Sequence, residues 1–232
     1  MSRRVRLAVF DLDGVLVEER SSWGYLHSVL GSRGVVEERG YSKLFERGLI
    51  SYSQWMELDL RAMIEVRGVV YCRELEEAAR RVRIARGARE VVDLLRRAGV
   101  PVAIVSAGVD LIASRVAEEL GIGEVYVNRL LCDSEGRLLP VGIEVVNPLH
   151  KGDIVRALAR KYGVDLAETM YVGDSEWDCS AFSVVGVPVV VGSRGVSCGN
   201  QPGLELIYVD SLLELYEKLV AGELVAVGVP TL

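Results

Sequence analysis

Two aspartates one residue apart follow a short apolar run near the N-terminus, in the stretch AVFDLDGVLVEER (8–20). Extended residues two apart point to the same side, so Asp11 and Asp13 are expected to face one point just beyond a strand. Gly14 lets the chain turn sharply there. Two carboxylates this close repel each other unless a cation or a proton lies between them. Oxygen ligands of this kind suit a hard divalent ion such as Mg²⁺, although an acidic loop after a strand would have the same residues.

A hydroxyl residue and two small residues follow a second apolar run. Ser106, Ala107 and Gly108 combine a side-chain hydroxyl with turning backbone N–H groups, and a helix is expected to begin near Asp110. The N-terminus of a helix carries a partial positive charge, so this stretch suits an anion such as a phosphoryl group. An ordinary helix cap would use the same residues, so this motif alone leaves both explanations open.

A lysine and two further acids come later in the chain. Lys151, in the stretch HKGD (150–153), stands at an expected helix start in a chain that is poor in lysine. Asp174 and Asp178 lie four residues apart on one face of a helical turn, where like charges repel unless a cation or donors intervene. A solvated lysine and an acidic helix N-terminus are the ordinary alternatives. The four groups together, at successive strand ends, form a joint pattern that is hard to assign to chance.

Short apolar β-type runs alternate with helical patterns through most of the chain. The runs cover 6–10, 101–105, 125–128, 169–172, 188–191 and 206–209, and the helical patterns cover 88–98, 111–120, 154–162 and 212–220. This alternation predicts an α/β fold, a Rossmann-like doubly wound parallel sheet with helices on both faces.

Residues 17–86 interrupt this alternation, with helical patterns at 23–30, 41–46, 53–66 and 73–82 and no convincing strand. We interpret them as a small helical cap inserted after the first strand, above the sheet edge where α/β folds bind ligands. The expected domains are a core of 1–16 and 87–232 and a cap of 17–86. Ser53 is the expected cap of the third of these helices. Residues 130–141 are expected to form a hairpin that turns at 133–136, and the apolar tail 224–232 is either an added strand or an oligomer contact.

The composition limits the classes of protein that fit. The chain has 232 residues, 50% of them hydrophobic, and a net charge of -6, which argues against a general nucleic-acid binder. No apolar run approaches the length of a membrane helix, and the N-terminal run is too short for a signal peptide. We therefore expect a cytoplasmic monomer or homodimer with no nucleic-acid or membrane partner. Scattered cysteines (Cys72, Cys132, Cys179 and Cys198) are expected to be reduced thiols and not a zinc site.

The four motifs resemble those of the haloacid dehalogenase superfamily, whose members are mostly phosphatases. DLDGV (11–15) resembles the first motif, Ser106 the second, Lys151 the third and GDSEWD (173–178) the fourth. The stretches VAIVSAGVDLIASRVAEELGI (102–122) and VNRLLCDSEGRL (127–138), together with HKGD and YVGDSEWD, are similar to the phosphoserine-phosphatase-like branch. The resemblance covers essentially the whole chain, including the helical cap.

The resemblance implies a Mg²⁺-dependent phosphatase that acts on a small phosphorylated metabolite. Asp11 would be the nucleophile and would form an aspartyl-phosphate. Asp13 would be the general acid that protonates the leaving group, and then the base that activates water. The implied metal ligands are Asp11, Asp13, Asp174 and Asp178.

Phosphoryl binding is implied for Ser106, the N–H groups of Ala107 and Gly108, and Lys151. Substrate choice is linked to Arg20, because phosphoserine-specific members carry Glu at that distance from the nucleophile. They also tend to carry Thr two residues after the second aspartate, where this chain has Val15. Arginine suits an anionic or sugar-like group better than an ammonium, so a substrate other than phosphoserine is favoured.

Two alternatives stay open besides the phosphatase. One is a phosphomutase of the same superfamily, and the other is a non-catalytic protein that binds phosphate or a metal. Among the aromatic residues of the cap, Trp23, Tyr25 and Trp55 either line the site or belong to the core of the cap.

Overall fold

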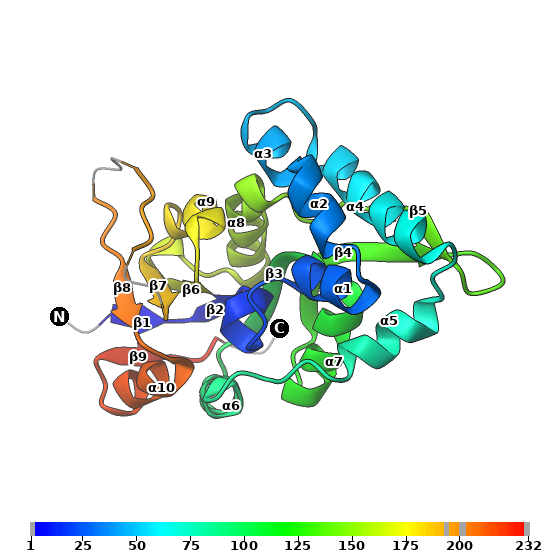
Figure 1. Ribbon diagram of the computed structural model, residues 1–232. Coiled ribbons are helices and arrows are strands. Elements are labelled where there is room, and N and C mark those ends of the chain that lie inside the picture. Colours follow the sequence, from blue (N-terminus) through cyan, green and yellow to red (C-terminus); the bar gives the residue numbers. More distant parts are fainter. Residues whose placement is uncertain (1–2, 193–194, 200–202, 230–232) are drawn as a thin grey trace.

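One central sheet organises the structure, a computed structural model that describes residues 3–192, 195–199 and 203–229 (Figure 1). Its seven strands lie in the order β5-β4-β3-β2-β6-β7-β8. They are β2 (Leu7–Phe10), β3 (Val102–Val109), β4 (Glu124–Cys132), β5 (Leu138–Ile143), β6 (Thr169–Gly173), β7 (Val187–Val191) and β8 (Ile207–Val209). Neighbours are parallel except in the β4–β5 hairpin, which is antiparallel. The predicted α/β class and the predicted hairpin are confirmed.

Helices cover both faces of this sheet, as the doubly wound prediction requires (Figure 1). One hydrophobic core is shared by α6 (Ala88–Arg97), α7 (Asp110–Leu120) and α10 (Leu212–Val220). A second core on the other face is shared by α8 (Lys151–Tyr162) and α9 (Cys179–Phe182). All four residues of β2 are fully buried, because a parallel strand in the middle of such a sheet has no face open to water.

A group of helices stands above the carboxyl ends of β2 and β3, after the short turn η1 (Leu12–Leu16). These are α1 (Ser22–Leu30), α2 (Arg33–Arg39), α3 (Tyr41–Glu46), α4 (Tyr52–Arg67) and α5 (Cys72–Ala79). The predicted helical cap is therefore confirmed. The expected cap residue Ser53 is wrong: Ser51 caps α4, since its hydroxyl accepts from the Gln54 N–H while the Gln54 side chain accepts from the Ser51 N–H. This reciprocal pair satisfies two free N–H groups at once.

The two ends of the inserted cap lie side by side where they leave the core. The Glu18 N–H donates to the Arg83 carbonyl at 3.0 Å, the Ala85 N–H donates to the Leu16 carbonyl at 2.9 Å, and Val17 and Ile84 form an antiparallel bridge. This narrow neck supports a division into a core of 1–16 and 87–232 and a cap of 17–86, which we propose as the domain boundaries.

A small second sheet joins the two ends of the described chain. It pairs β1 (Arg3–Val5) with β9 (Leu224–Ala226) in parallel. Part of the apolar tail is thus an added strand, one of the two expectations for it. Residues 230–232 of that tail lie outside the described residues.

The expectation of reduced cysteines is wrong. Cys72, at the start of α5 in the cap, is bonded to Cys132 at the end of β4, and Cys179 in α9 is bonded to Cys198. The Cα atoms of the pairs are 6.4 and 5.3 Å apart, within disulfide range. The partners are 60 and 19 residues apart in sequence, so the fold and not a local motif brings them together. The first disulfide ties the cap to the hairpin of the core.

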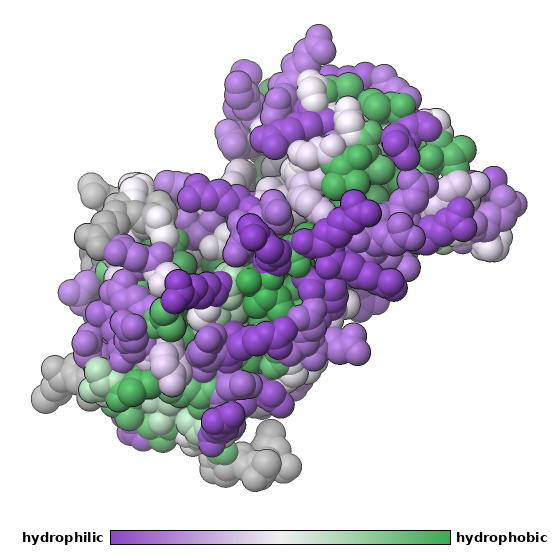
Figure 2. Space-filling view, turned by 60° about the horizontal axis from the view of Figure 1, so that its bottom comes forward, coloured by the Kyte–Doolittle hydropathy of each residue, from purple (hydrophilic) through white to green (hydrophobic). Residues whose placement is uncertain are grey.

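Polar residues cover much of one face of the molecule. Figure 2 shows one mostly hydrophilic face, with apolar residues gathered in smaller patches. In the part of the chain that the structure describes, none of the helices has the length and apolar composition that crossing a membrane requires.

Candidate active site

Asp11 is the first residue after β2 and lies at the centre of the site. The residue is only 5% exposed. Its Oδ1 accepts from the Leu12 N–H at 2.8 Å, and its Oδ2 faces the Lys151 Nζ at 2.9 Å. Burial raises the pKa of Asp11, while the Lys151 charge and the hydrogen bond from Ser106 oppose that rise. The carboxylate is therefore aimed by a cation that belongs to a distant segment, and this cation offsets part of the cost of burying its charge.

Lys151 begins α8 and lies between two carboxylates. The ammonium is 2.9 Å from Asp11 Oδ2 and 2.6 Å from Asp178 Oδ1, and the residue is 2% exposed. Burial works against its charged form, but the charges of Asp11 and Asp178 outweigh it and raise the pKa of Lys151. Hydrogen bonds between buried ions are among the stronger ones in proteins, so this lysine is fixed in place.

Asp178 is fully buried, and both its oxygens have protein partners. Oδ1 also accepts from the Tyr171 hydroxyl at 2.7 Å, and Oδ2 accepts from the backbone N–H groups of Asp174 and Ser175 at 3.1 and 3.3 Å. Asp178 thus connects β6, the turn after it, and Lys151. Its oxygens are already engaged, so its principal contribution is to position Lys151 and the chain around Asp174.

Asp174 offers the open oxygens of the cluster. Its carboxylate has no hydrogen-bond or ion-pair partner among the described residues, and ligand atoms of Asp11, Asp174 and Asp178 lie within 4.8 Å of one another. Burial, then the charges of Asp11 and Asp178, raise the pKa of Asp174 to about 7. A hard cation with oxygen ligands removes this repulsion, so the donor set fits Mg²⁺.

Gly14 lets the first and fourth motifs approach each other. It adopts a φ of +68°, and a Cβ at this position would lie 2.1 Å from the Asp174 Oδ2. Both the left-handed backbone and the close approach exclude a side chain. The glycine after the two aspartates therefore makes room for Asp174 beside Asp11.

Mg²⁺ is expected to stabilise the folded protein through this cluster. At a concentration 100 times its dissociation constant, a ligand of the native state adds about 2.7 kcal/mol to the free energy of unfolding. We expect a rise in the thermal midpoint with Mg²⁺ and its loss in Asp174→Asn, measured by differential scanning fluorimetry. Glu176→Gln is the matched control, because it removes the same charge from an exposed residue two positions away. An undiminished Mg²⁺ shift in Asp174→Asn would contradict the assignment of the site.

Asp13 is held by the first residue of α1. Its Oδ2 accepts from the Ser22 N–H at 2.9 Å and from the Ser22 hydroxyl at 2.8 Å, and its buried Oδ1 has no partner. Burial and the Asp11 charge raise the pKa of Asp13 to about 7. One oxygen is thus anchored to the cap and the other is left to carry or accept a proton.

The last part of β3, which carries Ser106, is held through the Ala107 carbonyl as well as through the Ser106 hydroxyl. The Ala107 carbonyl accepts from the Tyr52 hydroxyl at 2.7 Å, the Asn128 amide at 2.9 Å and the Trp23 indole at 3.1 Å. Tyr52 and Trp23 belong to the cap, so the cap contacts this part of β3 directly. The Gly108 N–H donates to the Ser106 hydroxyl at 3.1 Å.

Asn128 is a buried connector that sequence reasoning did not single out. Besides Ala107, its amide donates to the Val146 carbonyl at 3.1 Å, and its Oδ1 accepts from the N–H groups of Val145 and Val146 at 2.8 and 2.9 Å. The polar residue that interrupts the apolar run of β4 was the available signal. Asn128 therefore connects Ala107 in β3 to Val145 and Val146, in the segment that leads to Lys151.

Replacing Asn128 by Leu is expected to destabilise the protein. The change leaves the buried N–H of Val146 and the carbonyls of Ala107 and Val146 with fewer partners, and each orphaned buried group costs about 1–3 kcal/mol. We expect a loss of about 2–4 kcal/mol in urea unfolding. Arg129→Leu, at the exposed neighbour, is the control and should stay within about 0.5 kcal/mol. Equal effects of the two changes would refute the connector role.

One cleft of about 150 Å³ gathers the predicted site residues. It is lined by Asp11, Asp13, Arg20, Ser106, Ala107, Gly108, Lys151 and Asp174, with Asp178 directly behind them. Among the aromatic candidates, Trp23 and Trp55 line the cleft, whereas Tyr25 packs against the core and donates to the Ala78 carbonyl. Ser22, Tyr171 and Trp177 were missed by sequence reasoning.

Comparison with known proteins gives the family. The family described as haloacid dehalogenase-like hydrolase matches residues 8–183. The chain belongs to this family. Phosphoserine phosphatase of Methanocaldococcus jannaschii is 29% identical over 198 residues, which cover 84% of this chain and 90% of that protein. Phosphoserine phosphatase of Archaeoglobus fulgidus is 31% identical over 203 residues, which cover 84% of this chain and 55% of that protein.

Solved structures of this haloacid dehalogenase-like family share the fold. A phosphoserine phosphatase with a phospho-aspartyl intermediate analogue has a TM-score of 0.73 and 24% identity, and the match covers 94% of this chain and 99% of that one. An apo phosphoserine phosphatase has a TM-score of 0.74 and 23% identity, with 92% and 98% covered. The predicted superfamily, its phosphoserine-phosphatase-like branch and the prediction of a hydrolase are confirmed.

Proposed function

We propose that this protein is a Mg²⁺-dependent phosphatase that hydrolyses a small phosphomonoester through an aspartyl-phosphate on Asp11. The observation that carries the proposal is the placement of Asp11 Oδ2 against Lys151, at 2.9 Å, with Asp13 and Asp174 lining the same cleft. The curated relatives named above are phosphatases, which supports the same class of reaction.

In the first step, Asp11 Oδ2 attacks phosphorus. A bond forms between this oxygen and phosphorus while the bond to the leaving oxygen breaks, and Asp13 gives its proton to the leaving alkoxide. A carboxyl with a pKa of about 7 holds that proton in a useful fraction of molecules near neutral pH. In the second step, Asp13 takes a proton from water, which attacks phosphorus and frees Asp11.

The charge of the phosphoryl group is the main obstacle, because phosphoryl transfer depends on positioning and charge stabilisation. Lys151, Ser106 and the N–H groups of Ala107 and Gly108 are proposed to bind its oxygens. Asp11, the Asp13 main-chain carbonyl and Asp174 are proposed to hold Mg²⁺ directly, and Asp178, whose oxygens already have protein partners, is proposed to hold the waters of the metal. The ion would supply further positive charge against the phosphoryl oxygens. Asp174 has the open oxygens for this role.

We propose a substrate other than phosphoserine. Phosphoserine has an ammonium group, which a dedicated carboxylate would recognise. Within the described residues, the carboxylates that line the cleft are Asp11, Asp13 and Asp174, which the mechanism already uses. Arg20 lines the cleft. It occupies the sequence position at which the resemblance implies Glu in phosphoserine-specific members. The cytoplasmic location and the monomer or homodimer stay predictions.

The test is phosphate release from a panel of phosphomonoesters that includes an aryl phosphate, with Mg²⁺ and with EDTA. The proposal expects release that requires Mg²⁺ and needs no bisphosphorylated activator. A strict need for such an activator, with phosphate as a minor product, would indicate a phosphomutase. Absence of turnover across the whole panel would favour the non-catalytic binding protein.

A further inference from the structure

All three tryptophans of the chain line the proposed substrate cleft. Trp23 comes from α1 and Trp55 from α4, both in the cap, and Trp177 comes from the short turn η4 (Glu176–Asp178) in the core. Tyr52 completes an aromatic wall. Its members are packed together, with ring centroids 5.7 Å apart for Tyr52 and Trp55 and 6.3 Å apart for Trp55 and Trp177.

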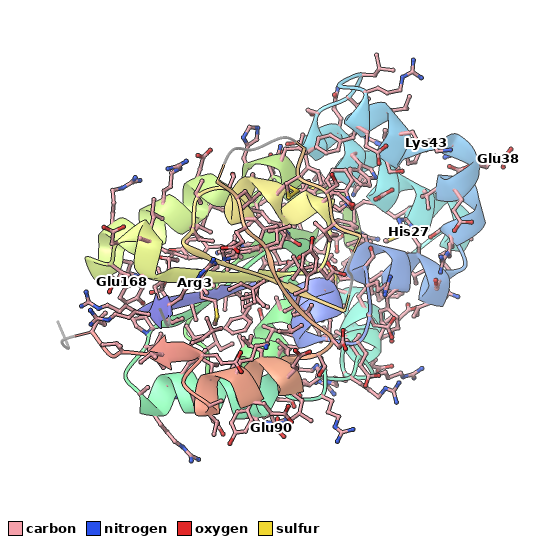
Figure 3. All side chains as sticks on the ribbon, turned by 90° about the vertical axis from the view of Figure 1, so that its left-hand side faces the viewer. Arg3, His27, Glu38, Lys43, Glu90 and Glu168 are labelled. Atoms are coloured by element: carbon pink, nitrogen blue, oxygen red, sulfur yellow. A yellow bond between two sulfur atoms is a disulfide. The ribbon has the colours of Figure 1, made fainter. Side chains whose placement is uncertain are left out.

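Two polar atoms of this wall already have a partner in the protein. The Trp23 indole and the Tyr52 hydroxyl both donate to the Ala107 carbonyl. One helical turn after Trp55 on α4, Asp59 is buried, with its Oδ1 3.5 Å from the Nε2 of His27. Figure 3 shows His27 within the cap and Glu38 at its outer edge. The wall therefore offers a ligand mainly ring surface, since the donors of Trp23 and Tyr52 are already used.

The wall is also backed by a rigid packing partner. Phe45 is buried behind it, with its ring centroid 5.3 Å from that of Trp55 and 6.0 Å from that of Trp177. Aromatic side chains fixed in this way lose little conformational freedom when a ligand binds, which favours binding. Such surfaces suit a flat ring, since aromatic pairs gain energy beyond their buried area.

The charged residues at the cleft also bear on the kind of substrate that it can bind. Lys151 is engaged by Asp11 and Asp178, so Arg20 is the cation left at the cleft for the rest of a substrate. Arg20 is exposed and has no ion-pair or hydrogen-bond partner among the described residues. The cleft volume of about 150 Å³ would be shared by the phosphoryl group and the ring, so a small ring fits better than a large one.

We propose that the site selects phosphomonoesters whose alcohol carries one small planar ring and no ammonium group. The ring would lie against Trp55 and Trp177, and an anionic substituent on it would face Arg20. This inference rests on the phosphatase function proposed above and names the substrate class for it. Open-chain alcohols and amino-bearing alcohols would lack these contacts.

The test compares substrates with similar alkoxide leaving groups. Benzyl phosphate should have a kcat/KM at least about tenfold above that of glycerol phosphate and of phosphoserine, since its ring would stack on two residues, Trp55 and Trp177, and each such contact gives about three- to tenfold. Trp177→Leu should reduce the ratio of benzyl phosphate to glycerol phosphate by about three- to tenfold. Tyr25→Phe is the control, because this cap tyrosine packs against the core and should leave the ratio unchanged.

The charge preference has its own comparison. A carboxylate on the benzyl ring should raise kcat/KM over an aminomethyl group on the same ring, and Arg20→Glu should reverse that order. Hydrolysis of glycerol phosphate or phosphoserine as fast as benzyl phosphate would overturn the substrate class. An unchanged ratio in Trp177→Leu would overturn it as well.

Binding separates this inference from the proposed function. In Asp11→Asn with Mg²⁺, intrinsic fluorescence comes mainly from tryptophans that all line the cleft, so benzyl phosphate should change it at lower concentration than glycerol phosphate. If no phosphomonoester is hydrolysed, the phosphatase proposal fails while this comparison still decides the ring preference. Equal half-saturating concentrations for the two ligands would refute that preference even in an active enzyme.

Discussion

Asp11→Asn is expected to reduce phosphate release by roughly 10⁴-fold or more, as loss of a nucleophile does in other covalent enzymes. Asparagine has nearly the same shape and can keep the hydrogen bond from the Leu12 N–H, but its amide oxygen is a poor nucleophile. The measurement is kcat/KM on the best substrate of the panel. A residual rate within tenfold of the wild type would rule out Asp11 as the nucleophile.

The control for this change is the covalent intermediate itself. Acid quenching with a ³²P-labelled substrate should trap label on the wild-type protein in a form that hydroxylamine releases, as expected of an acyl phosphate. Asp11→Asn should trap none. The variant should also retain the thermal midpoint of the wild type, because Lys151 keeps its contact with Asp178. Labelling of Asp11→Asn at the wild-type level would show that another residue is the nucleophile.

The sequence was sufficient to predict that the candidate site residues gather in one place. Asp11 and Asp174 directly follow a strand, and Ser106 lies near the end of one; the carboxyl ends of parallel strands meet at one edge of the sheet. The direction of the strands, and not any contact between side chains, made the prediction possible. Lys151 was predictable for a related reason, because the helix it starts returns from the hairpin to the same edge.

Contacts between the cap and the core could not be predicted from the sequence. Trp23 and Tyr52 converge with Asn128 on the Ala107 carbonyl from segments that are 84, 55 and 21 residues away. Periodicity shows that a residue is on the buried side of a helix, but not which carbonyl its polar atom reaches. For this reason the sequence left open which aromatic residues line the site: Trp23 and Trp55 do, Tyr25 packs against the core, and Trp177 was overlooked.

Disulfide pairing was hidden in a similar way. Four cysteines allow three different full pairings, and spacing favours none of them when no close pair exists. Cys72 meets Cys132 because the start of α5 lies beside the end of β4, where Tyr71 and Arg137 form an isolated bridge. That contact depends on how the whole cap is positioned on the core, and no local sequence pattern predicts this position.

Lys151→Met is expected to destabilise the protein by about 3–5 kcal/mol and to abolish most activity. The change leaves Asp11 and Asp178 buried without the cation between them, and removing one member of a buried ion pair has a cost of this size. It also removes positive charge from the place where the phosphoryl group is proposed to bind. A loss of roughly 10²–10³-fold in kcat is expected on that ground. Urea unfolding and steady-state kinetics measure the two effects.

Stability and catalysis can be separated by a second change. The double variant Lys151→Met/Asp178→Asn removes one of the two unpaired carboxylates, so it should recover part of the lost stability but none of the activity. Lys161→Met is the matched control, because this lysine pairs with Glu124 at the surface and exposed pairs contribute about 0–1 kcal/mol. Recovery of activity in the double variant would show that Lys151 only neutralises Asp178. Persistent inactivity in a double variant that has regained stability and still shows the Mg²⁺-dependent rise in thermal midpoint would place the charge of Lys151 in the reaction itself, since Asp11 would then lie in an intact fold and metal site without its cation.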